Sequence, residues 1–507
     1  MNELVLVLDF GGQYKELIAR SVRSMSVHSE IRPGNISADE IARLAPIGII
    51  LTGGPSSVYE PDSPKCDPKL FNLGIPILGI CYGMHMICYQ LGGEVKPGAA
   101  GEFGTITVSP TEPLSHLFGG SAAPFDALMS HGDSVSRLPD GFRATSSTPM
   151  CIASCENAAR KLYGVQFHPE TKHTKCGGEI IQRFLFGVCG ASGDYKLDDY
   201  IDKQTQLIRQ KVGAEKVLLG LSGGVDSAVC ASLLSLAIPE QLVCIFVDHG
   251  LMRQNEGDEI EQVFSKRKLR FIRADAEKRF LKALKGVTDP EAKRKIIGTE
   301  FIRVFEEEAK KLGDIPFLAQ GTIYPDIVES GGEYGAVIKS HHNVGGLPEN
   351  LAFTEVVEPL SGLFKNEVRV LGKKLGLPAS LVNRQPFPGP GLAIRIMGQI
   401  TEQKLDIIRK ADAILREEID PLKTRPDQYF AVLTDTRSVG VKGDDRTYDP
   451  VVAIRAVTTD DFMTCGYAPL SHKTLARIST RITNEIKSVS RIVYDITPKP
   501  PATVEWE

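Results

Sequence analysis

The residues that first suggest chemistry lie in a short turn, Gly-Ile-Cys-Tyr-Gly, at positions 79–83. The turn follows an apolar segment, IPIL, and precedes a helical pattern, MHMICYQL. Glycines on both sides of a nucleophile permit a sharp strand-to-helix bend that exposes the central side chain. A helix N-terminus also favours the thiolate form of a cysteine. Cys81 is therefore a candidate nucleophile. The alternative is a small buried cysteine, which we favour for the other nine cysteines.

A base for this nucleophile is offered by the segment GVQFHPE, which ends at Glu170. Residues two apart on an extended segment share a face, so Glu170 can fix the tautomer and orientation of His168. A third group of this kind completes a nucleophile–base pair. We predict a triad in which Cys81 attacks, His168 acts as base and acid, and Glu170 orients His168. A structural histidine is the alternative.

A second candidate site lies in the segment KVLLGLSGGVDSAVC, residues 216–230, which has the pattern of a strand, a glycine turn and a helix. Turns of this kind bind phosphates through backbone N–H groups at a helix N-terminus. This one lacks the lysine of the usual ATP loop, which tracks a transferring γ-phosphate. Its hydroxyl and N–H groups can instead hold a leaving pyrophosphate. The prediction is cleavage of the α–β bond of a nucleotide.

Two further features bear on this glycine loop. The next strand, CIFVD, ends at Asp248, and α/β sheets bind ligands at the carboxyl ends of their strands. Pyrophosphate carries much charge, so we expect Mg²⁺ with Asp226 as a candidate ligand. The alternative is a simple helix cap, with Ser222 as N-cap and Asp226 in the first turn.

The composition disfavours several classes of protein. The chain has 507 residues, of which 59 are basic and 63 acidic, and its net charge is −4. This balance gives no support for a nucleic-acid or anionic-membrane surface. We find no apolar run long enough to span a bilayer and no signal-peptide pattern. Ten cysteines without a Cys-x-x-Cys pair indicate reduced thiols and a cytoplasmic protein.

The chain is expected to form three domains. Residues 1–190 and 196–384 each contain apolar strands followed by glycine turns and helical patterns, which predicts two α/β domains with mostly parallel sheets. The polar segment ASGDYKLDDY, from Ala191, is expected to be the linker between them. The segment RQPFPGPG is a boundary or a rigid ligand-binding loop. Residues 385–507 are expected to form a smaller α+β domain.

Three motifs of the first domain, GICYGMH, GVQFHPE and TGGPSSVY, resemble the class I glutamine amidotransferase family. The resemblance implies that Cys81 attacks the side-chain amide of glutamine, releases ammonia and forms a thioester that is hydrolysed to glutamate. It also implies an oxyanion hole from the backbone N–H groups of Gly54 and Tyr82, which are fixed before charge develops. Glutamine is common in the family where His85 stands, so the role of His85 stays open. SHGDSV, around His131, resembles a substrate-side loop.

The hexapeptide SGGVDS is similar to the phosphate-binding motif of the ATP pyrophosphatases. The resemblance implies a fold like that of the adenine-nucleotide α-hydrolases. It implies that Mg²⁺, bound together with ATP, contacts Asp226 and Asp326. The residues expected to bind ATP and pyrophosphate are Ser222, Gly223, Gly224, Val225, Asp226, Ser227, Asp248 and Lys365.

Four segments, KSHHNVGGLPE, RQPFPGPGLAIR, GVKGDDRTYDPVVAIRAV and KPPATVEWE, resemble the GMP synthetase family across essentially the full chain. The resemblance implies that XMP attacks the α-phosphorus of ATP to give adenylyl-XMP and pyrophosphate. Ammonia then displaces AMP and gives GMP. It also implies a homodimer formed through the C-terminal domain. The residues implied to bind XMP are Pro388, Gly389, Gln428, Arg491, Lys499, Thr503 and Glu505.

Two other functions stay open at this point. One is a glutamine-dependent synthetase for a different acceptor, as in NAD or asparagine synthetases, although these usually carry another glutaminase type. The other is a catalytically silent nucleotide-binding regulator, which need not retain both candidate sites.

Two segments outside these sites carry structural predictions. The terminal segment PKPPATVEWE has stiffening prolines and the only tryptophan, Trp506, which predicts a docked chain end. The loop 339–346, with His341 and His342, is either a lid over ATP or a surface loop.

Overall fold

The computed structural model describes residues 3–111, 115–121, 123–329, 353–459 and 464–507, without the side chains of 99 and 100. The loop 339–346 lies outside the described residues. The chain divides into two compact units, Met1–Lys196 and Leu197–Glu507. The expected linker from Ala191 ends earlier than predicted, because Leu197 already begins a helix.

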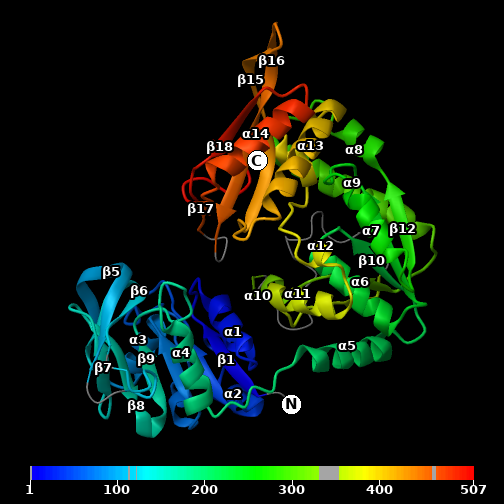
Figure 1. Ribbon diagram of the computed structural model, residues 1–507. Coiled ribbons are helices and arrows are strands. Elements are labelled where there is room, and N and C mark those ends of the chain that lie inside the picture. Colours follow the sequence, from blue (N-terminus) through cyan, green and yellow to red (C-terminus); the bar gives the residue numbers. More distant parts are fainter. Residues whose placement is uncertain (1–2, 112–114, 122, 330–352, 460–463) are drawn as a thin grey trace. The chain divides into compact units, whose positions relative to one another are not determined.

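The first unit is built on a nine-stranded sheet in the order β2-β1-β3-β4-β9-β8-β7-β5-β6 (Figure 1). The first five strands in this order pair in parallel, and the rest pair antiparallel. The strands are β1 (Leu4–Asp9), β2 (His28–Pro33), β3 (Gly48–Leu51), β4 (Ile77–Ile80), β5 (Glu94–Pro110), β6 (Phe125–Arg137), β7 (Arg143–Ser147), β8 (Ile152–Asn157) and β9 (Leu162–Val165). The helices are α1 (Lys15–Ser24), α2 (Ala38–Leu44), α3 (Tyr82–Gln90) and α4 (Gly177–Gln182), with short turns η1 (Pro68–Asn72), η2 (Ala158–Arg160) and η3 (Arg183–Val188).

The parallel strands β3, β4 and β9 of this sheet are buried on both faces, which explains their continuous apolar sequences. All four residues of β3, β4 and β9 are buried. Leu6 and Leu8 of β1 share one core cluster with Met84 and Ile87 of α3. The sheet thereby fixes α3, which begins directly after Cys81.

The second unit begins with five parallel strands in the order β12-β11-β10-β13-β14. The strands are β10 (Val217–Leu221), β11 (Leu242–Asp248), β12 (Arg270–Asp275), β13 (Phe317–Ala319) and β14 (Glu355–Val357). The helices are α5 (Leu197–Val212), α6 (Val225–Ala237), α7 (Glu256–Phe264), α8 (Glu277–Ala283), α9 (Pro290–Lys310), α10 (Tyr324–Glu329), α11 (Lys365–Lys374) and α12 (Ala379–Val382). Strand order reverses between β10 and β13, and ligands bind at such a switch point in open α/β sheets.

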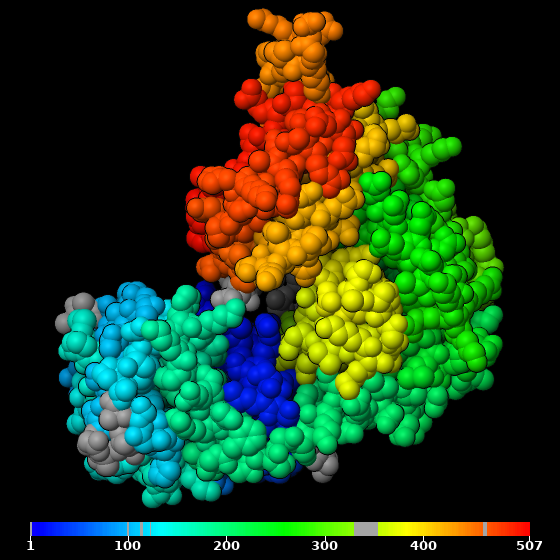
Figure 2. All heavy atoms as spheres, in the orientation of Figure 1, coloured from blue at the N-terminus to red at the C-terminus, as the bar shows by residue number. Residues whose placement is uncertain are grey.

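The unit continues into a second sheet, in which β15, β16 and β17 are antiparallel and β18 pairs in parallel with β16. Its elements are η4 (Gly391–Arg395), α13 (Glu402–Ile419), β15 (Gln428–Lys442), β16 (Asp445–Thr458), β17 (Gly466–Tyr467), α14 (His472–Glu485) and β18 (Arg491–Asp495). The β15–β16 hairpin end projects from the surface of this unit (Figure 2). Two α/β sheets followed by an α+β part confirm the predicted fold class.

The two parts of the second unit share one hydrophobic core. Leu218 of β10 and Ile245 of β11 belong to the same cluster as Ile408 of α13 and Leu433 of β15. The expected boundary at 384–385 is therefore a change of sheet rather than a break in packing.

The chain end is docked by charged groups, which confirms the prediction made from PKPPATVEWE. Lys293 of α9 is fully buried, and its ammonium donates to Glu507 Oε2 at 2.5 Å and to the Ile396 carbonyl at 2.7 Å. Trp506 Nε1 donates to Asp495 Oδ2 at 3.0 Å. A buried ammonium is stable only when it is paired, so the last residue of the chain stabilises α9.

We expect Glu507→Gln to destabilise the second unit by about 3 kcal/mol, because it leaves the Lys293 ammonium buried without a counter-charge. Urea unfolding followed by the fluorescence of Trp506 measures the change. The double variant Lys293→Met/Glu507→Gln should recover much of the loss. The exposed pair of Glu417 with Arg481 provides the control, and Glu417→Gln should cost less than about 1 kcal/mol. An equal cost for both single substitutions contradicts the assignment.

Candidate active sites

Cys81 lies on a strained turn between β4 and α3. Its backbone has φ 54° and ψ −108°, and its amide donates to the Val165 carbonyl at 2.7 Å. A left-handed φ of this kind is rare outside glycine and marks functional turns. A Cβ on Gly83 would lie 2.4 Å from the Leu51 carbonyl oxygen. Glycine is therefore required where α3 meets β3, and the elbow follows from close packing.

His168 and Glu170 lie beside this elbow. His168 Nδ1 is 2.8 Å from Glu170 Oε1, and the His168 amide donates to the Leu128 carbonyl at 3.0 Å. A Cβ on Gly53 would contact His168 Cε1 at 3.4 Å and Cys81 Cβ at 3.8 Å. The structure thus brings the three residues of the predicted triad together, with the Glu170 side chain fully buried.

The environment of His168 favours its charged form. Burial acts to lower its pKa, but the Glu170 charge and hydrogen bonds with Cys81 and Glu170 outweigh burial and raise the pKa to about 10. A protonated imidazole next to a cysteine stabilises the thiolate. The site is therefore arranged for nucleophilic attack by sulfur.

One further residue at this site, Gln166, was missed by the sequence analysis. Gln166 Nε2 donates to Cys81 Sγ at 3.8 Å, and its Oε1 lies 2.7 Å from His85 Nε2. Burial lowers the pKa of His85 to about 4, so His85 is neutral and can donate to Gln166. The signal was present, since Gln166 stands two residues before His168 and thus on the same face of an extended segment.

The predicted oxyanion-hole residues adjoin each other. A Cβ on Gly54 would lie 3.3 Å from the ring of Tyr82. The Tyr82 hydroxyl donates to the Pro64 carbonyl at 2.6 Å, which anchors the first residue of α3. Ser130, next to His131, brings its carbonyl oxygen within 3.8 Å of Cys81 Sγ.

The predicted phosphate loop lines a pocket of about 510 Å³ in the second unit. Gly223 has φ 80° and needs to be glycine, since side chains rarely adopt this conformation. The N-cap of α6 is Gly224 rather than Ser222, and no side chain of the described residues caps this helix. The Ser222 hydroxyl lies 3.1 Å from the Ser227 hydroxyl. The helix-cap alternative for Ser222 is therefore wrong, and the loop presents hydroxyl and N–H groups to the pocket.

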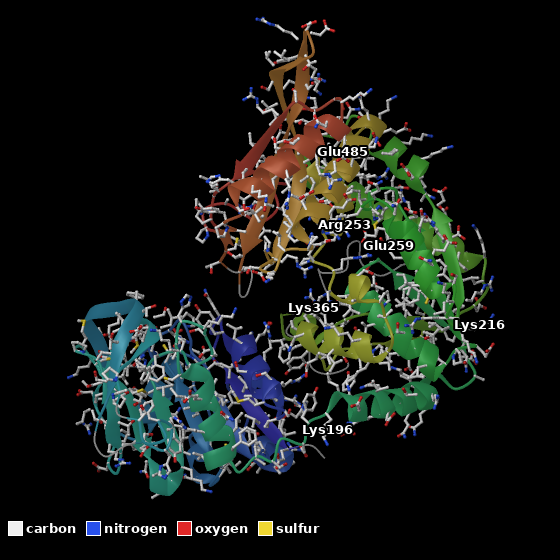
Figure 3. The ribbon with its side chains drawn as sticks, viewed as in Figure 1. Lys196, Lys216, Arg253, Glu259, Lys365 and Glu485 are labelled. Carbon is white, nitrogen blue, oxygen red and sulfur yellow. The ribbon has the colours of Figure 1, made fainter. Side chains whose placement is uncertain are left out.

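Asp226, Asp326 and Lys365 line the same pocket. Lys365, the first residue of α11 (Figure 3), donates to Asp226 Oδ2 at 2.5 Å. Asp226 Oδ1 is buried and has no hydrogen-bond partner among the described residues. Asp326 Oδ2 accepts from the Ile323 amide at 2.9 Å. A buried acceptor without a donor is costly, so Asp226 Oδ1 is a position for a cation.

Asp248 is placed differently from the other predicted ATP residues. Its carboxylate accepts from Arg273 at 3.0 and 2.6 Å and from the Gly250 amide at 3.2 Å. It lines a neighbouring cavity of about 310 Å³ rather than the pocket of the glycine loop. In the structure, the Asp248 carboxylate is therefore paired with Arg273.

Two arginines of the pocket were missed by the sequence analysis. Arg384 donates to the Gly223 carbonyl at 3.1 Å and pairs with Glu256 at 2.5 Å. Arg369 donates to the Arg384 carbonyl at 3.3 Å, and its Nε is buried without a partner among the described residues. Arg384 is the first residue of the Pro/Gly segment RQPFPGPG, which was the available signal. Pro388 and Gly389 of that segment also line the pocket.

Part of the predicted XMP set is held together by Arg395. This fully buried side chain donates to both carboxylate oxygens of Glu505, at 3.1 and 2.8 Å. Gln428 Nε2 also donates to Glu505, at 3.1 Å. Thr503 Oγ1 donates to the Glu505 carbonyl, and Arg455 donates to the Thr503 carbonyl at 3.0 Å. Gln428, Thr503 and Glu505 therefore form one cluster.

The two remaining predicted XMP residues lie outside this cluster. Lys499 exchanges backbone hydrogen bonds with Cys465, at 2.8 and 3.0 Å. Arg491 is exposed at the start of β18. Asp495, at the other end of β18, is four positions further along the chain, or about 13 Å along a strand.

The fold and the matching family models together define a class of protein: a class I glutamine amidotransferase domain followed by a synthetase part. The model for class I glutamine amidotransferases matches residues 6–188. The NAD synthase model matches residues 199–294, and the model for the GMP synthase C-terminal domain matches residues 417–506.

Full-length relatives then decide which family it is. A glutamine-hydrolysing GMP synthase of Acetivibrio thermocellus is 56% identical over 510 residues, covering 100% of both chains. Proteins of the same name from Clostridium botulinum (53%, covering 100% of both chains) and Treponema denticola (55%, covering 100% of this chain and 97% of the relative) are similarly close. The chain belongs to the glutamine-hydrolysing GMP synthase family. It is a ligase of guanine nucleotide biosynthesis, and the alternatives of another acceptor and of a silent regulator are excluded.

Two general features, membrane-spanning helices and the cysteines, can also be described. No helix in the described part of the chain is both long and apolar enough to cross a membrane. All ten cysteines belong to described residues, and none of them forms a disulfide in the structure.

We expect Glu170→Gln to lower the pKa of His168, because the substitution removes the charge that favours the imidazolium form. The alkaline limb of the pH profile of glutaminase activity should move to lower pH. The value of kcat/KM should fall on the order of 10²- to 10⁴-fold. Histidine NMR, assigned with His168→Asn, measures the titration directly. The control Glu179→Gln removes an exposed carboxylate and should leave both unchanged, and an unmoved His168 titration in Glu170→Gln contradicts the triad.

Proposed function

We propose that this chain makes GMP from XMP by two linked reactions. Cys81, His168 and Glu170 hydrolyse glutamine in the first unit, and the second unit activates XMP with ATP so that the ammonia can react. The observation that carries the proposal is the 2.8 Å contact of His168 Nδ1 with Glu170 Oε1 beside the Cys81 elbow. A base held in this way is the requirement for a sulfur nucleophile.

In the glutaminase reaction, His168 accepts the thiol proton of Cys81, and the sulfur attacks the side-chain carbonyl carbon of glutamine. The backbone N–H groups of Gly54 and Tyr82 stabilise the oxyanion. His168 then gives its proton to the departing nitrogen, which leaves as ammonia. Water, deprotonated by His168, hydrolyses the thioester and releases glutamate. Gln166 Nε2 stabilises the thiolate between turnovers.

In the synthetase reaction, O2 of XMP attacks the α-phosphorus of ATP and the α–β bond breaks. The loop from Ser222 to Ser227 holds the leaving pyrophosphate through hydroxyl and N–H groups. Lys365 reaches the same pocket and supplies positive charge. Ammonia then attacks C2 of adenylyl-XMP and displaces AMP, which is a better leaving group than the carbonyl oxygen.

Asp226 and Asp326 are the proposed Mg²⁺ residues. The buried Asp226 Oδ1, which has no donor among the described residues, fits a cation, and Asp326 lines the same pocket. A bound Mg²⁺ neutralises phosphate charge. Lys365 pairs with the other oxygen, Asp226 Oδ2, at 2.5 Å, so Oδ1 would be available to hold the cation.

XMP is proposed to bind between the Pro/Gly segment and the chain end. Pro388 and Gly389 line the ATP pocket, and Gln428, Thr503 and Glu505 form the cluster on Arg395. Amide and carboxylate groups suit the polar edge of a purine. Lys499 and Arg491 are the proposed partners of the 5′-phosphate, because cations bind phosphate strongly.

We also propose a homodimer formed through residues 385–507. The β15–β16 hairpin exposes Val439, Val441 and Tyr448, at 56%, 72% and 62%. Apolar side chains at the end of a projecting hairpin are typical of a contact surface. Sedimentation equilibrium should give twice the chain mass, and Val441→Lys should reduce it toward one.

We expect Cys81→Ala to abolish glutamine-dependent GMP formation, by a factor on the order of 10³ or more, because the nucleophile is lost. Synthesis from added ammonia should persist, since the synthetase pocket is intact. GMP release with each nitrogen source measures the split. Loss of both activities contradicts two separate sites.

Asp226→Ala is the matched variant at the other site. It should stop synthesis from both nitrogen sources and leave the alkylation of Cys81 unchanged. Product analysis of the unmodified chain with XMP should find AMP and pyrophosphate. ADP and phosphate would contradict cleavage of the α–β bond.

A further inference from the structure

Three potential metal ligands meet in the first unit outside the triad. They are Glu102 on β5, His131 on β6 and Cys151 in the turn between β7 and β8. One carboxylate oxygen, one ring nitrogen and the sulfur all lie within 4.8 Å of one another. Glu102 and His131 are buried, and Cys151 is half-buried.

The imidazole of His131 is held in the tautomer that a metal ligand needs. His131 Nδ1 is 2.8 Å from the Asp133 carbonyl, which only accepts, so Nδ1 carries the ring proton. His131 Nε2 therefore directs its lone pair at Glu102 Oε2, 3.1 Å away. Two acceptors at this distance require a positive charge between them, either a proton or a metal ion.

The sulfur of Cys151 completes the group. It lies 3.1 Å from the same Glu102 Oε2, and the Thr148 hydroxyl donates to it at 3.5 Å. Burial raises the pKa of the Cys151 thiol to about 12, so without a metal ion the sulfur keeps its proton. Thr148 stabilises the thiolate that ligation would produce.

We propose that Glu102, His131 and Cys151 bind a divalent transition metal ion of the zinc type. Nitrogen, sulfur and oxygen ligands together are typical of Zn²⁺, and its tetrahedral bonds separate ligand atoms by about 3.3–3.8 Å. Two of the spacings here are 3.1 Å, and all three lie within 4.8 Å. A carbonyl on the second ring nitrogen is the usual outer contact of a metal-bound histidine. The thiolate disfavours Mg²⁺, which prefers oxygen ligands.

This site is distinct from the Mg²⁺ position proposed for the ATP pocket. It joins β5, β6 and the β7–β8 turn. The adjacent Ser130 contributes the carbonyl that lies 3.8 Å from Cys81 Sγ. Metal binding thus ties down the strand that borders the nucleophile.

Co²⁺ is the probe, because a thiolate–Co²⁺ bond has its own near-ultraviolet absorption. The full-length chain carries Cys81→Ala throughout, since Cys81 and His168 can themselves take a soft metal. We expect one equivalent of Co²⁺ to bind with a thiolate band. Adding Cys151→Ser should remove the band and weaken binding at least about 10-fold. Adding Cys176→Ser, at another half-buried cysteine of this unit, should change neither.

Binding displaces the thiol proton and the proton held between His131 and Glu102, so the apparent Co²⁺ affinity should rise with pH. Excess Zn²⁺ should displace the probe and raise the melting temperature. Glu102→Gln is a second variant, which should keep the band and weaken binding. A Cys81→Ala chain that shows no thiolate band, or a band that survives Cys151→Ser in a folded protein, overturns the proposal and leaves a proton between His131 and Glu102.

Discussion

The hydrogen bond from the Cys81 amide to the carbonyl of Val165, the last residue of β9, continues the parallel pairing of β4 with β9 one residue beyond the end of β4. Parallel strands end at the same edge of a sheet, so the residues that follow them must meet there. Cys81 follows β4, and His168 comes three residues after β9. The second unit obeys the same rule, since Gly321, shortly after β13, packs against Asp226 and Ser227 shortly after β10. Both sites therefore depend on strand pairing.

Several buried charged side chains in residues 197–507 are held by specific partners. Arg395 is fully buried and donates to both carboxylate oxygens of Glu505, and its guanidinium lies over the ring of Phe430 at 4.0 Å. Arg253 lies over Phe387 of the Pro/Gly segment at 4.2 Å. Lys293 is paired with Glu507. Such pairs add less stability than apolar packing, but their geometry is directional, which suits a chain end that contributes side chains to a site.

The antiparallel half of the first sheet also borders the candidate site around Cys81. The β5–β6 ribbon places Ser130 at the sulfur of Cys81, and the next residue, His131, belongs to the Glu102–Cys151 group. Adjacent residues of a strand point to opposite faces. One ribbon can therefore border the nucleophile with a backbone carbonyl while its side chains build a separate polar cluster.

The fold class and the local parts of both sites were predictable because they are short-range. The Cys81 elbow, the spacing of His168 and Glu170, and a glycine turn between strand and helix each lie within a few residues, so strand and helix periodicity place them.

Other features depend on residues that are far apart in sequence. Arg384 reaches the Gly223 carbonyl across 161 positions, and Gln166 reaches Cys81 across 85. Arg273 donates hydrogen bonds to the carboxylate of Asp248, which the sequence alone had predicted to bind a nucleotide. The amino-acid sequence by itself determined the family, the elbow and the phosphate turn, because each is encoded in contiguous residues. Only the tertiary structure decided which side chains pair across the strands, because a hydrogen bond depends on a separation in space that sequence distance does not set.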